Sequence, residues 1–319
     1  PSTCEEDDTI ILALQGSLWS MGSGGGSEQA TQLTGWEIEA TWPVWSPDCS
    51  RIAFQNYNDN QYHIWTMNPD GSDLQQVTDG HWDHREPTWS PGGEKIAFAS
   101  DRGVQDSDYP NETGNYDIWI IDLATSEYEQ CTTGGSEDHS PAWSPDGDTI
   151  AYVEGTAGWY GLSYELYTIT NCETSTRGYI GSGFAPTWRG VGDLVYLNND
   201  YQVMVDNQPM TVDEDVFPFP VGMLPDGGFL YAANGKLRKR NALGENLEEI
   251  DFKAPITVTR ADRTGKDYNK DHGFYDKSPR DVRGIQSPVL SPDGKRVAFI
   301  ALNALWVMDI GKKPKQLTN

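Results

Sequence analysis

The sequence predicts an all-β fold, a β-propeller built from four-stranded antiparallel blades. Three observations favour it: a repeated turn motif, short apolar runs that follow each turn, and no helical periodicity over any useful length. Gly and Pro, which are frequent in turns, number 33 and 19 among the 319 residues. Seven blades are expected, with six as the alternative if one degenerate unit merges with its neighbour.

The turn motif is an aromatic or aliphatic residue followed by Ser-Pro-Asp-Gly or a variant of it. It begins at Trp45, Trp89, Trp143 and Leu290. Pro fixes φ at the first corner of a turn, Asp hydrogen-bonds the local backbone, and Gly takes the left-handed position. The motif therefore predicts a tight turn after the first strand of each unit.

Each turn is followed by short runs that suit strands. The first run reads Ile-Ala-Phe at 52–54 and 96–98, and a second reads Ile-Trp at 64–65 and 118–119. These runs are apolar on both faces, which predicts strands covered on both sides, as in sheets that stack face to face. A last run ends in an apolar residue followed by threonine, such as Val-Thr at 77–78.

Seven such units fill one predicted domain, residues 1–319. Their ranges are about 10–34, 42–78, 87–132, 141–180, 185–212, 217–252 and 288–318, with an insertion at 253–287. The unit at 10–34 reads as the last three strands of a blade without its first. The units at 185–212 and 217–252 are degenerate copies with turns at 189–192 and 224–227.

This repeat resembles that of the TolB-type β-propeller, over nearly the whole chain. The resemblance implies the fold and little about function, because such propellers occur in scaffolds and hydrolases alike. Residues 255–263, 280–285, 291–294 and 305–309 also resemble the propeller region that precedes a metal-dependent amidohydrolase domain. The metal ligands of that family begin with a His-x-His in a later barrel. This sequence has no His-x-His, so no residue here inherits that activity.

The formal net charge is −25, from 23 basic and 48 acidic residues. Such a surface repels nucleic acid and anionic lipid, so neither is expected as a partner. Residues 1–235 hold 6 basic and 37 acidic residues, whereas residues 236–319 hold 17 and 11. The division is either local drift in composition or two surfaces of opposite sign that attract one another between copies.

Four cysteines occur, at 4, 49, 131 and 172, with no Cys-x-x-Cys. An even number favours disulfides, and with them a periplasmic or extracellular location. Cys4 precedes the first turn and Cys49 lies in the turn of the next unit, which predicts that these two pair. A Cys131–Cys172 bond is the remaining pairing, although the repeat places the two residues on opposite faces. The sequence shows no signal peptide, so a mature form is expected, and Asn111 begins a glycosylation sequon.

Metal sites are the first chemistry to consider. Four carboxylates in or beside the insertion at 101–117 supply hard oxygen ligands that suit calcium: Asp101, Asp106, Asp108 and Asp117. The alternative is a solvated acidic loop. His81 and His84, with Glu86 close behind, form a weaker candidate. His84 and His139 are interpreted as equivalent positions in two units, which favours architecture over chemistry.

No catalytic residue is predicted. The sequence has no Gly-x-Ser-x-Gly, and its glycine-rich stretch at 22–26 lacks the lysine of a phosphate loop. The expected function is a secreted, non-catalytic propeller that binds proteins or assembles with itself. One alternative is the propeller part of a larger secreted amidohydrolase- or peptidase-like hydrolase, and another is a cation or small-ligand binder.

Self-association is expected from two features. The blade at 10–34 lacks a first strand, and an open position in a sheet can be filled by a strand from a neighbour. The uneven charge favours head-to-tail contact between copies, and contacts of that kind that do not close produce filaments. The alternative is a monomer that completes its own ring.

Overall fold

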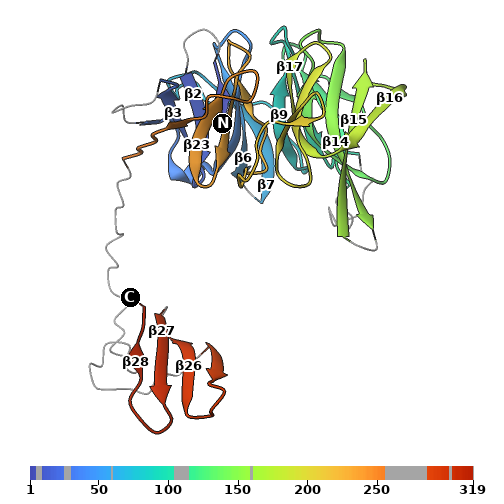
Figure 1. Ribbon diagram of the computed structural model, residues 1–319. Helices are drawn as coiled ribbons and strands as arrows, with labels where there is room; N and C mark the ends of the chain where they lie inside the picture. Colours follow the sequence, from blue (N-terminus) through green and yellow to red (C-terminus); the bar gives the residue numbers. More distant parts are fainter. Residues whose placement is uncertain are drawn as a thin grey trace. The chain divides into compact units, whose positions relative to one another are not determined.

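The computed structural model of the protein describes residues 1–4, 9–24, 30–58, 60–103, 115–158, 161–255, 286–301 and 304–318. These residues form two compact units, 1–256 and 257–319. The strands belong to seven four-stranded antiparallel sheets, and neighbours in each sheet are consecutive in sequence. The predicted all-β class and the seven four-stranded units are therefore confirmed (Figure 1).

The first three sheets lie in the first unit and are numbered in chain order. Sheet 1 contains β1 (Ser2–Thr3), β2 (Thr9–Leu14), β3 (Ser17–Gly22) and β4 (Thr31–Gln32). Sheet 2 contains β5 (Ala40–Trp45), β6 (Ile52–Asn58), β7 (Gln61–Met67) and β8 (Gln75–Gln76). Sheet 3 contains β9 (His84–Trp89), β10 (Lys95–Ser100), β11 (Asp117–Asp122) and β12 (Tyr128–Gln130). A short 3-10 helix, η1 (Trp36–Ile38), joins sheets 1 and 2.

Three more sheets complete the first unit, and the seventh lies in the second unit. Sheet 4 contains β13 (Glu137–Trp143), β14 (Thr149–Gly158), β15 (Gly161–Thr170) and β16 (Glu173–Ser182). Sheet 5 contains β17 (Phe184–Gly190), β18 (Asp193–Leu197), β19 (Val203–Val205) and β20 (Gln208–Pro209). Sheet 6 contains β21 (Gly222–Met223), β22 (Phe229–Ala233), β23 (Lys236–Arg240) and β24 (Glu248–Ile250). Sheet 7 contains β25 (Gln286–Leu290), β26 (Arg296–Ala301), β27 (Ala304–Asp309) and β28 (Lys315–Gln316).

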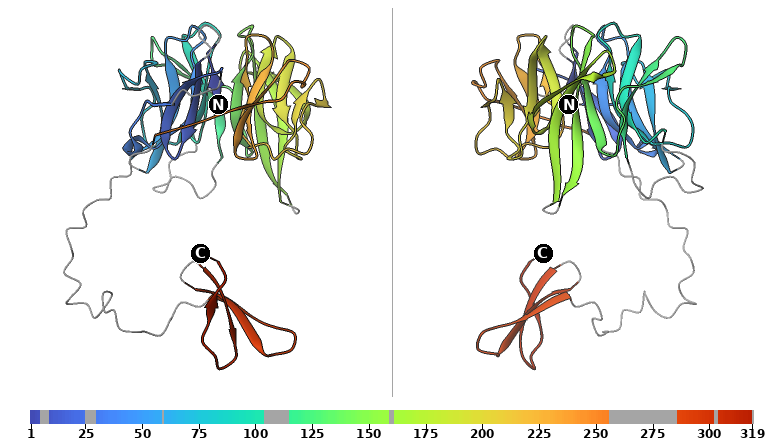
Figure 2. Two further views of the ribbon diagram at one scale, coloured as in Figure 1. Left: turned by 60° about the vertical axis from the view of Figure 1, so that its left-hand side comes forward. Right: turned by 90° about the vertical axis from the view of Figure 1, so that its right-hand side faces the viewer.

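Apolar clusters between consecutive sheets hold the first unit together. Phe54 of sheet 2 packs with Ile11 of sheet 1, and Ala53 on the opposite face packs with Phe98 of sheet 3. The same arrangement continues to sheet 6, where Leu230 packs with Ile10 of sheet 1. Sheets 1 and 6 accordingly lie side by side, as β2, β3 and β23 show in Figure 1 and as the left-hand view of Figure 2 also shows. The six sheets thus form a closed ring in the first unit, and no unit of the repeat has merged with its neighbour.

One prediction about sheet 1 is wrong. The unit at 10–34 was expected to lack its first strand, but β1 occupies that position and pairs Ser2 with Ile11 and Thr3 with Ile10. Two residues are too short to produce a periodic signal in the sequence, which is why the strand escaped prediction. The open position that supported strand exchange is therefore filled by the chain itself.

The first strands of sheets 2 to 5 share a β-bulge. In each, the residue before a proline has a left-handed backbone, at φ of 55° for Trp42, 57° for Glu86, 51° for Ser140 and 52° for Ala185. The pairing with the second strand shifts register at each of these positions. A bulge changes the direction in which side chains point. Its recurrence at four equivalent sites shows that it belongs to the repeat.

Candidate functional site

The candidate site is a cavity of about 1060 Å³ in the first unit. The first strands of all six sheets contribute to its wall, which is the position of a propeller's central channel. Side chains from the bulged segments, including Trp42 and Glu86, lie along it. A concave, mostly apolar surface with a few placed polar groups is typical of a binding site.

Aromatic side chains form one part of the cavity wall. Trp42 of β5 meets Phe219 edge to face, with ring centroids 5.5 Å apart. Phe217 and Phe219 are 45% and 46% exposed, although large aromatic side chains gain most free energy from burial. Exposed apolar groups that gather in a concavity indicate a surface that a partner covers.

A fixed cation, Arg85 of sheet 3, also lines the cavity. Its guanidinium lies 4.4 Å from the ring centre of Tyr62 and 5.1 Å from that of Tyr116, and donates to Asp83 Oδ2 at 2.5 Å. Asp83 is itself fixed, because its Oδ1 accepts from the Tyr62 amide at 2.8 Å. Cation–π contacts and the ion pair hold Arg85 in one orientation beside the cavity.

Next to Arg85, the Glu86 carboxylate is held in a polar chain across three sheets. Its Oε2 accepts from the Ser140 amide at 2.5 Å and from Ser140 Oγ at 3.0 Å, while the Glu86 amide donates to Gln55 at 2.8 Å. Burial raises the pKa of Glu86, but the hydrogen bonds from His139 and Ser140 outweigh it and leave that pKa lowered. Glu86 is therefore an anion at neutral pH, with 19% of its side chain exposed.

Serine, histidine and carboxylate meet here without forming a catalytic relay. His139 Nδ1 lies 3.1 Å from Ser140 Oγ and 3.7 Å from Glu86 Oε2, so a single ring nitrogen faces both groups. A relay needs one ring nitrogen toward the nucleophile and the other toward the acid. In addition, Ser140 Oγ already donates to Glu86. The arrangement suits recognition of a ligand better than activation of a nucleophile.

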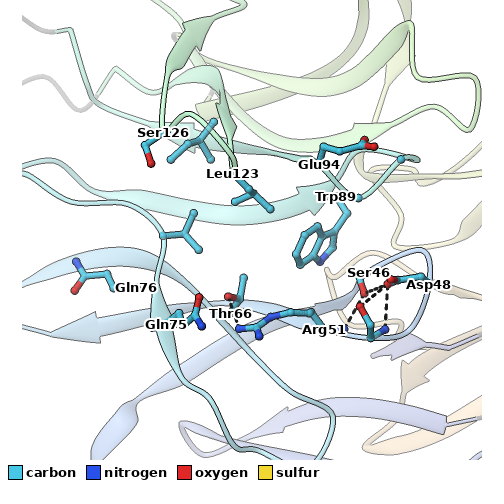
Figure 3. A pocket seen from close by; sticks show the side chains of 15 residues that line it. Ser46, Asp48, Arg51, Thr66, Gln75, Gln76, Trp89, Glu94, Leu123 and Ser126 are labelled. Carbon is cyan, nitrogen blue, oxygen red and sulfur yellow. Dashed lines mark hydrogen bonds between the residues drawn. The ribbon is translucent and has the colours of Figure 1, made fainter.

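A second concavity of about 430 Å³ lies between the turns of sheets 2 and 3 (Figure 3). Arg51 lies along it, but its guanidinium already donates to Asp73 Oδ2 at 2.6 Å and to Thr66 Oγ1 at 3.0 Å. Ser46 and Asp48 likewise bond each other at 2.6 Å within their own turn. These side chains stabilise the repeated turn, so the central cavity remains the better candidate.

Two carboxyl groups between sheets 3 and 4 have raised pKa values. Burial raises the pKa of Asp117 to about 6 and that of Asp138 to about 6. For Asp138, the nearby charges of Glu154 and Asp117 add to the effect of burial, while Arg177 opposes it. Neither side chain lies on the wall of the central cavity. We therefore expect their titration to change the stability of the fold and not the chemistry of the cavity.

Replacing Asp138 by Asn is expected to stabilise the protein above neutral pH. Because the folded pKa lies above the ordinary value of 3.8, the carboxylate destabilises the fold increasingly as pH rises through 6. The gain in unfolding free energy should be about 3 kcal/mol at pH 8 and about 1 kcal/mol at pH 4.5. Urea unfolding of both proteins at the two pH values measures it. An identical difference at both would show that Asp138 is not the titrating group.

Both predicted disulfides are present. Cys4 bonds Cys49 with Cα atoms 5.7 Å apart, and Cys131 bonds Cys172 with Cα atoms 4.2 Å apart. The expectation that Cys131 and Cys172 lie on opposite faces is wrong. Cys131 follows the last strand of sheet 3 and Cys172 lies in the β15–β16 turn of sheet 4, and those elements meet where the sheets pack.

The metal predictions have different outcomes. Asp106 and Asp108 of the calcium prediction lie outside the described residues, as does the sequon at Asn111. Asp101 Oδ1 accepts from the Asp83 amide at 2.9 Å, and Asp117 Oδ2 accepts from Gln130 at 3.0 Å. Within the described ranges, no three His, Cys, Asp or Glu side chains come together as a metal site. His81, His84 and Glu86 are thus not a ligand set, and calcium binding at 101–117 stays a prediction.

The equivalence of His84 and His139 is also wrong. The ladders pair His84 with Ser100 and Asp138 with Glu154, so His84 corresponds to Asp138. Arg85 and His139 are then the matching positions, each two residues before the proline of its strand. Aligning the units on Pro87 and Pro141 gives this register from sequence alone.

Comparisons with known proteins agree with this architecture. The sequence is 34% identical over 140 residues to an uncharacterized protein of Agrobacterium fabrum, covering 43% of this chain and 46% of that protein. It is 30% identical over 100 residues to the Tol-Pal system protein TolB of Alcanivorax borkumensis, covering 31% and 21%. A putative TolB from Agrobacterium tumefaciens superposes with a TM-score of 0.50 at 15% identity, covering 80% of this chain and 83% of that one. The chain has a TolB-like propeller fold.

Peptidases are a second group of similar proteins. The TolB-like propeller is 26% identical over 223 residues to the uncharacterized peptidase YuxL of Bacillus subtilis, covering 68% of this chain and 29% of that protein. A puromycin-hydrolyzing peptidase of Mycobacterium tuberculosis superposes with a TM-score of 0.52 at 11% identity, covering 92% and 50%. The chain spans less than half the length of the curated relatives it matches. No family model matches it, and no helix in the described ranges is long and apolar enough to cross a membrane.

Proposed function

We propose that the TolB-like propeller is a protein-binding module that receives an extended segment of a partner protein in its central cavity. The observation that carries this proposal is the composition of the cavity lining, which combines the exposed Phe217 and Phe219 with the fixed charges of Arg85 and Glu86. Aromatic and Arg side chains dominate the binding free energy of protein interfaces. A fixed cation beside a fixed anion would orient a polar backbone or charged side chain.

An oxidising compartment is part of this proposal. Cys4 and Cys131 are both 1% exposed, so their disulfides are sheltered from soluble reductants. Disulfides of this kind persist in the periplasm and outside the cell and are rare in the cytosol. The partner would then be a periplasmic or extracellular protein, and the acidic surface of the chain would steer basic partners toward it.

Peptide selection tests the proposal. Phage-displayed random peptides are selected against the purified chain under non-reducing conditions, and the affinity of the best synthetic peptide is measured by calorimetry. We expect Phe219→Ala and Arg85→Ala each to weaken binding about tenfold or more, because each removes an anchor of the cavity wall. Tyr179→Ala is the matched control, since Tyr179 is exposed on the outer strand β16. Equal affinities for wild type, the two cavity variants and the control would exclude the cavity as the binding site.

A second candidate is that the chain is the propeller part of a larger hydrolase. The likeness to YuxL supports it, because that alignment covers 68% of this chain but 29% of the peptidase. Here the propeller would admit or position substrate for a catalytic domain elsewhere in the polypeptide. Reading the coding sequence on both sides of the codons for residues 1–319 tests this candidate: a catalytic domain in frame on either side supports it, and an open reading frame that encodes none excludes it.

A further inference from the structure

The charged side chains that line the central cavity are not all neutralised. The described part of the lining holds two basic side chains, Arg85 and Lys236. Arg85 donates to Asp83 Oδ2 at 2.5 Å, and Lys236 donates to Glu249, so each cation already has a carboxylate partner. Glu86 also lines the cavity, and among the described residues no Lys or Arg pairs with it. The cavity therefore contains a fixed anion whose charge is not compensated by a fixed cation.

Only one of the two oxygens of this carboxylate is used. Glu86 Oε2 accepts from the backbone amide and the hydroxyl of Ser140, at 2.5 and 3.0 Å, and neither donor carries a net charge. His139 Nδ1 lies farther away, 3.7 Å from the same oxygen. Oε1 accepts no hydrogen bond from the described residues. A partly buried carboxylate with an unused oxygen gains most from a ligand that brings both a positive charge and an N–H donor.

Trp42 provides an apolar surface beside this anion. Trp42 and Glu86 occupy equivalent positions in consecutive sheets, because each is the bulged residue before the proline of its strand. Gln55 joins the two strands, since it accepts from the Glu86 amide at 2.8 Å and donates to Thr41 Oγ1 at 3.0 Å. Thr41 directly precedes Trp42. Indole rings attract cations, and long basic side chains cover apolar surface with their methylene stems.

We propose that a lysine or arginine side chain of the bound segment lies between Trp42 and Glu86, with its charged group on Glu86 Oε1 and its stem along the indole ring. Because this subsite belongs to the proposed binding cavity, the inference rests on the proposed function. An amino terminus also brings charge and N–H donors, but it has no long stem to cover the ring. The formal net charge of −25 raises the local concentration of basic segments around the chain.

The probe is the best peptide that selection against the purified chain yields, synthesised with an acetylated amino terminus. In a series of peptides, each lysine in turn is replaced by acetyl-lysine and each arginine by citrulline, which removes the charge and keeps the stem. Calorimetry measures the affinity of every peptide for wild type and for Glu86→Gln. We expect one replacement to weaken binding to wild type about tenfold or more, because it removes a charged hydrogen bond.

The same replacement should leave binding to Glu86→Gln unchanged, because that variant has already lost the negative charge. Glu173→Gln is the matched control, since it removes one carboxylate from the exposed outer strand β16 and should behave as wild type. Thermal unfolding checks that each variant is folded. If Glu86→Gln does not fold, the series on wild type still decides: a series in which no replacement weakens binding about tenfold excludes a basic side chain at this subsite.

Failure of this inference is distinct from failure of the proposed function. If no peptide binds, or if Phe219→Ala leaves the affinity unchanged, the proposed function is wrong and the subsite with it. The subsite alone is wrong if binding depends on Phe219 but the best peptide contains no lysine or arginine. It is equally wrong if every replacement weakens binding to wild type and to Glu86→Gln by the same factor. Binding that is lost when the amino terminus is acetylated would assign Glu86 to the terminus and exclude a side chain there.

Discussion

Replacing both Cys4 and Cys49 by alanine is expected to lower the unfolding free energy by about 4 kcal/mol. The bond joins residues 45 positions apart, and a loop of that length restricts the unfolded chain by about this amount. For a domain of this size the loss corresponds to a fall in melting temperature of about 10 °C. Thermal unfolding of wild type and variant, without reductant, measures the difference.

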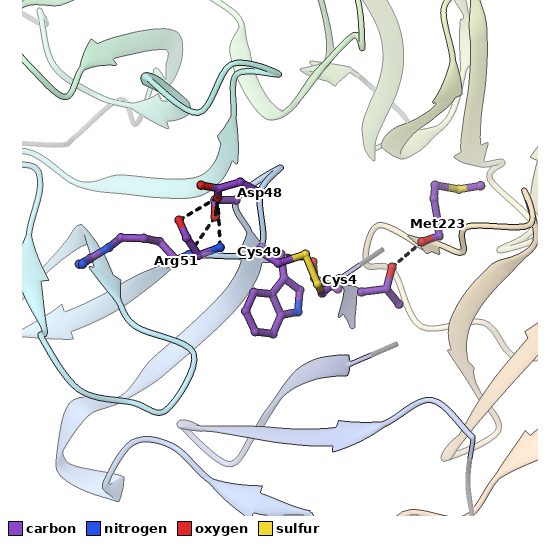
Figure 4. The surroundings of a disulfide bond; sticks show 10 residues. Cys4, Asp48, Cys49, Arg51 and Met223 are labelled. Atoms are coloured by element: carbon purple, nitrogen blue, oxygen red, sulfur yellow. Dashed lines mark hydrogen bonds between the residues drawn. A yellow bond between two sulfur atoms is a disulfide. The ribbon is translucent and has the colours of Figure 1, made fainter. Parts of the chain in front are cut away.

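The position of this bond in the ring gives the variant a second, local effect. β1 makes a ladder of only two residue pairs with β2, yet it is the strand of sheet 1 that contacts sheet 6. Thr3 donates a side-chain hydrogen bond to the Met223 carbonyl of sheet 6, and Cys4 anchors the strand to sheet 2 through Cys49 (Figure 4). Without the bond, so short a strand should detach readily and open the contact between sheets 6 and 1.

The second disulfide is the matched control, because Cys131 and Cys172 lie 41 positions apart and should contribute a similar entropic term. That bond joins sheets 3 and 4, away from the ring closure. In hydrogen exchange, amides at 222–223 should therefore exchange faster than in wild type in the variant without Cys4 and Cys49. In the variant without Cys131 and Cys172, their exchange rate should be unchanged. Equal exchange of these amides in both variants would exclude a role of Cys4 in closing the ring.

Most of the fold could be predicted from turn chemistry. Ser-Pro-Asp-Gly sequences place the turn between the first two strands, and the Ile-Ala-Phe runs give strands that must be covered on both faces. Even the degenerate units at 185–212 and 217–252 correspond to sheets 5 and 6. β1 could not be predicted, because its two residues form no periodic pattern. They are held instead by pairing with β2 and by the disulfide that joins the following residue to sheet 2.

The candidate site was harder to predict than the fold. Arg85 and Glu86 lie beside Pro87, in a strand whose bulge redirects side chains toward the channel. The bulge is a property of backbone conformation, and the sequence signals it only through the proline that follows. The hydrogen bonds from Ser140 to Glu86 join residues 54 positions apart, and only the ring brings them together.

Burial of His84 is expected to make the protein less stable in acid. The residue is completely buried between His63, Phe98 and Tyr128, and its Nε2 lies 3.3 Å from the Asp79 carbonyl. Burial lowers the pKa of His84 to about 4, helped by the positive charge of Arg102 and by His63, and opposed by Asp79 and Asp83. The folded protein therefore keeps this ring neutral at pH values where the unfolded chain protonates it.

Between pH 7.5 and pH 5 the protein is thus expected to lose stability through His84. The unfolded histidine takes up a proton below its ordinary pKa of 6.5, whereas the folded one does so only near 4. The free energy of unfolding therefore decreases as pH falls through this window. The loss attributable to His84 is about 2 kcal/mol at pH 5. In His84→Phe, which retains an aromatic ring beside Phe98, this part of the pH dependence should disappear, although the variant also loses its contact with the Asp79 carbonyl.

The measurement is the difference between the two proteins, because other groups titrate in the same window. Asp117 and Asp138, with pKa values raised to about 6, take up protons first in the folded state, so they stabilise the fold as pH falls and oppose His84. His63, whose pKa is also lowered by burial, acts in the same direction as His84 and remains in both proteins. Urea unfolding at pH 7.5, 6 and 5 should therefore show the variant gaining on wild type by about 2 kcal/mol across the range. Parallel curves for the two proteins would mean that the pKa of His84 in the folded state lies near its ordinary value of 6.5, and that the fold tolerates a protonated His84 between sheets 2 and 3 in acid.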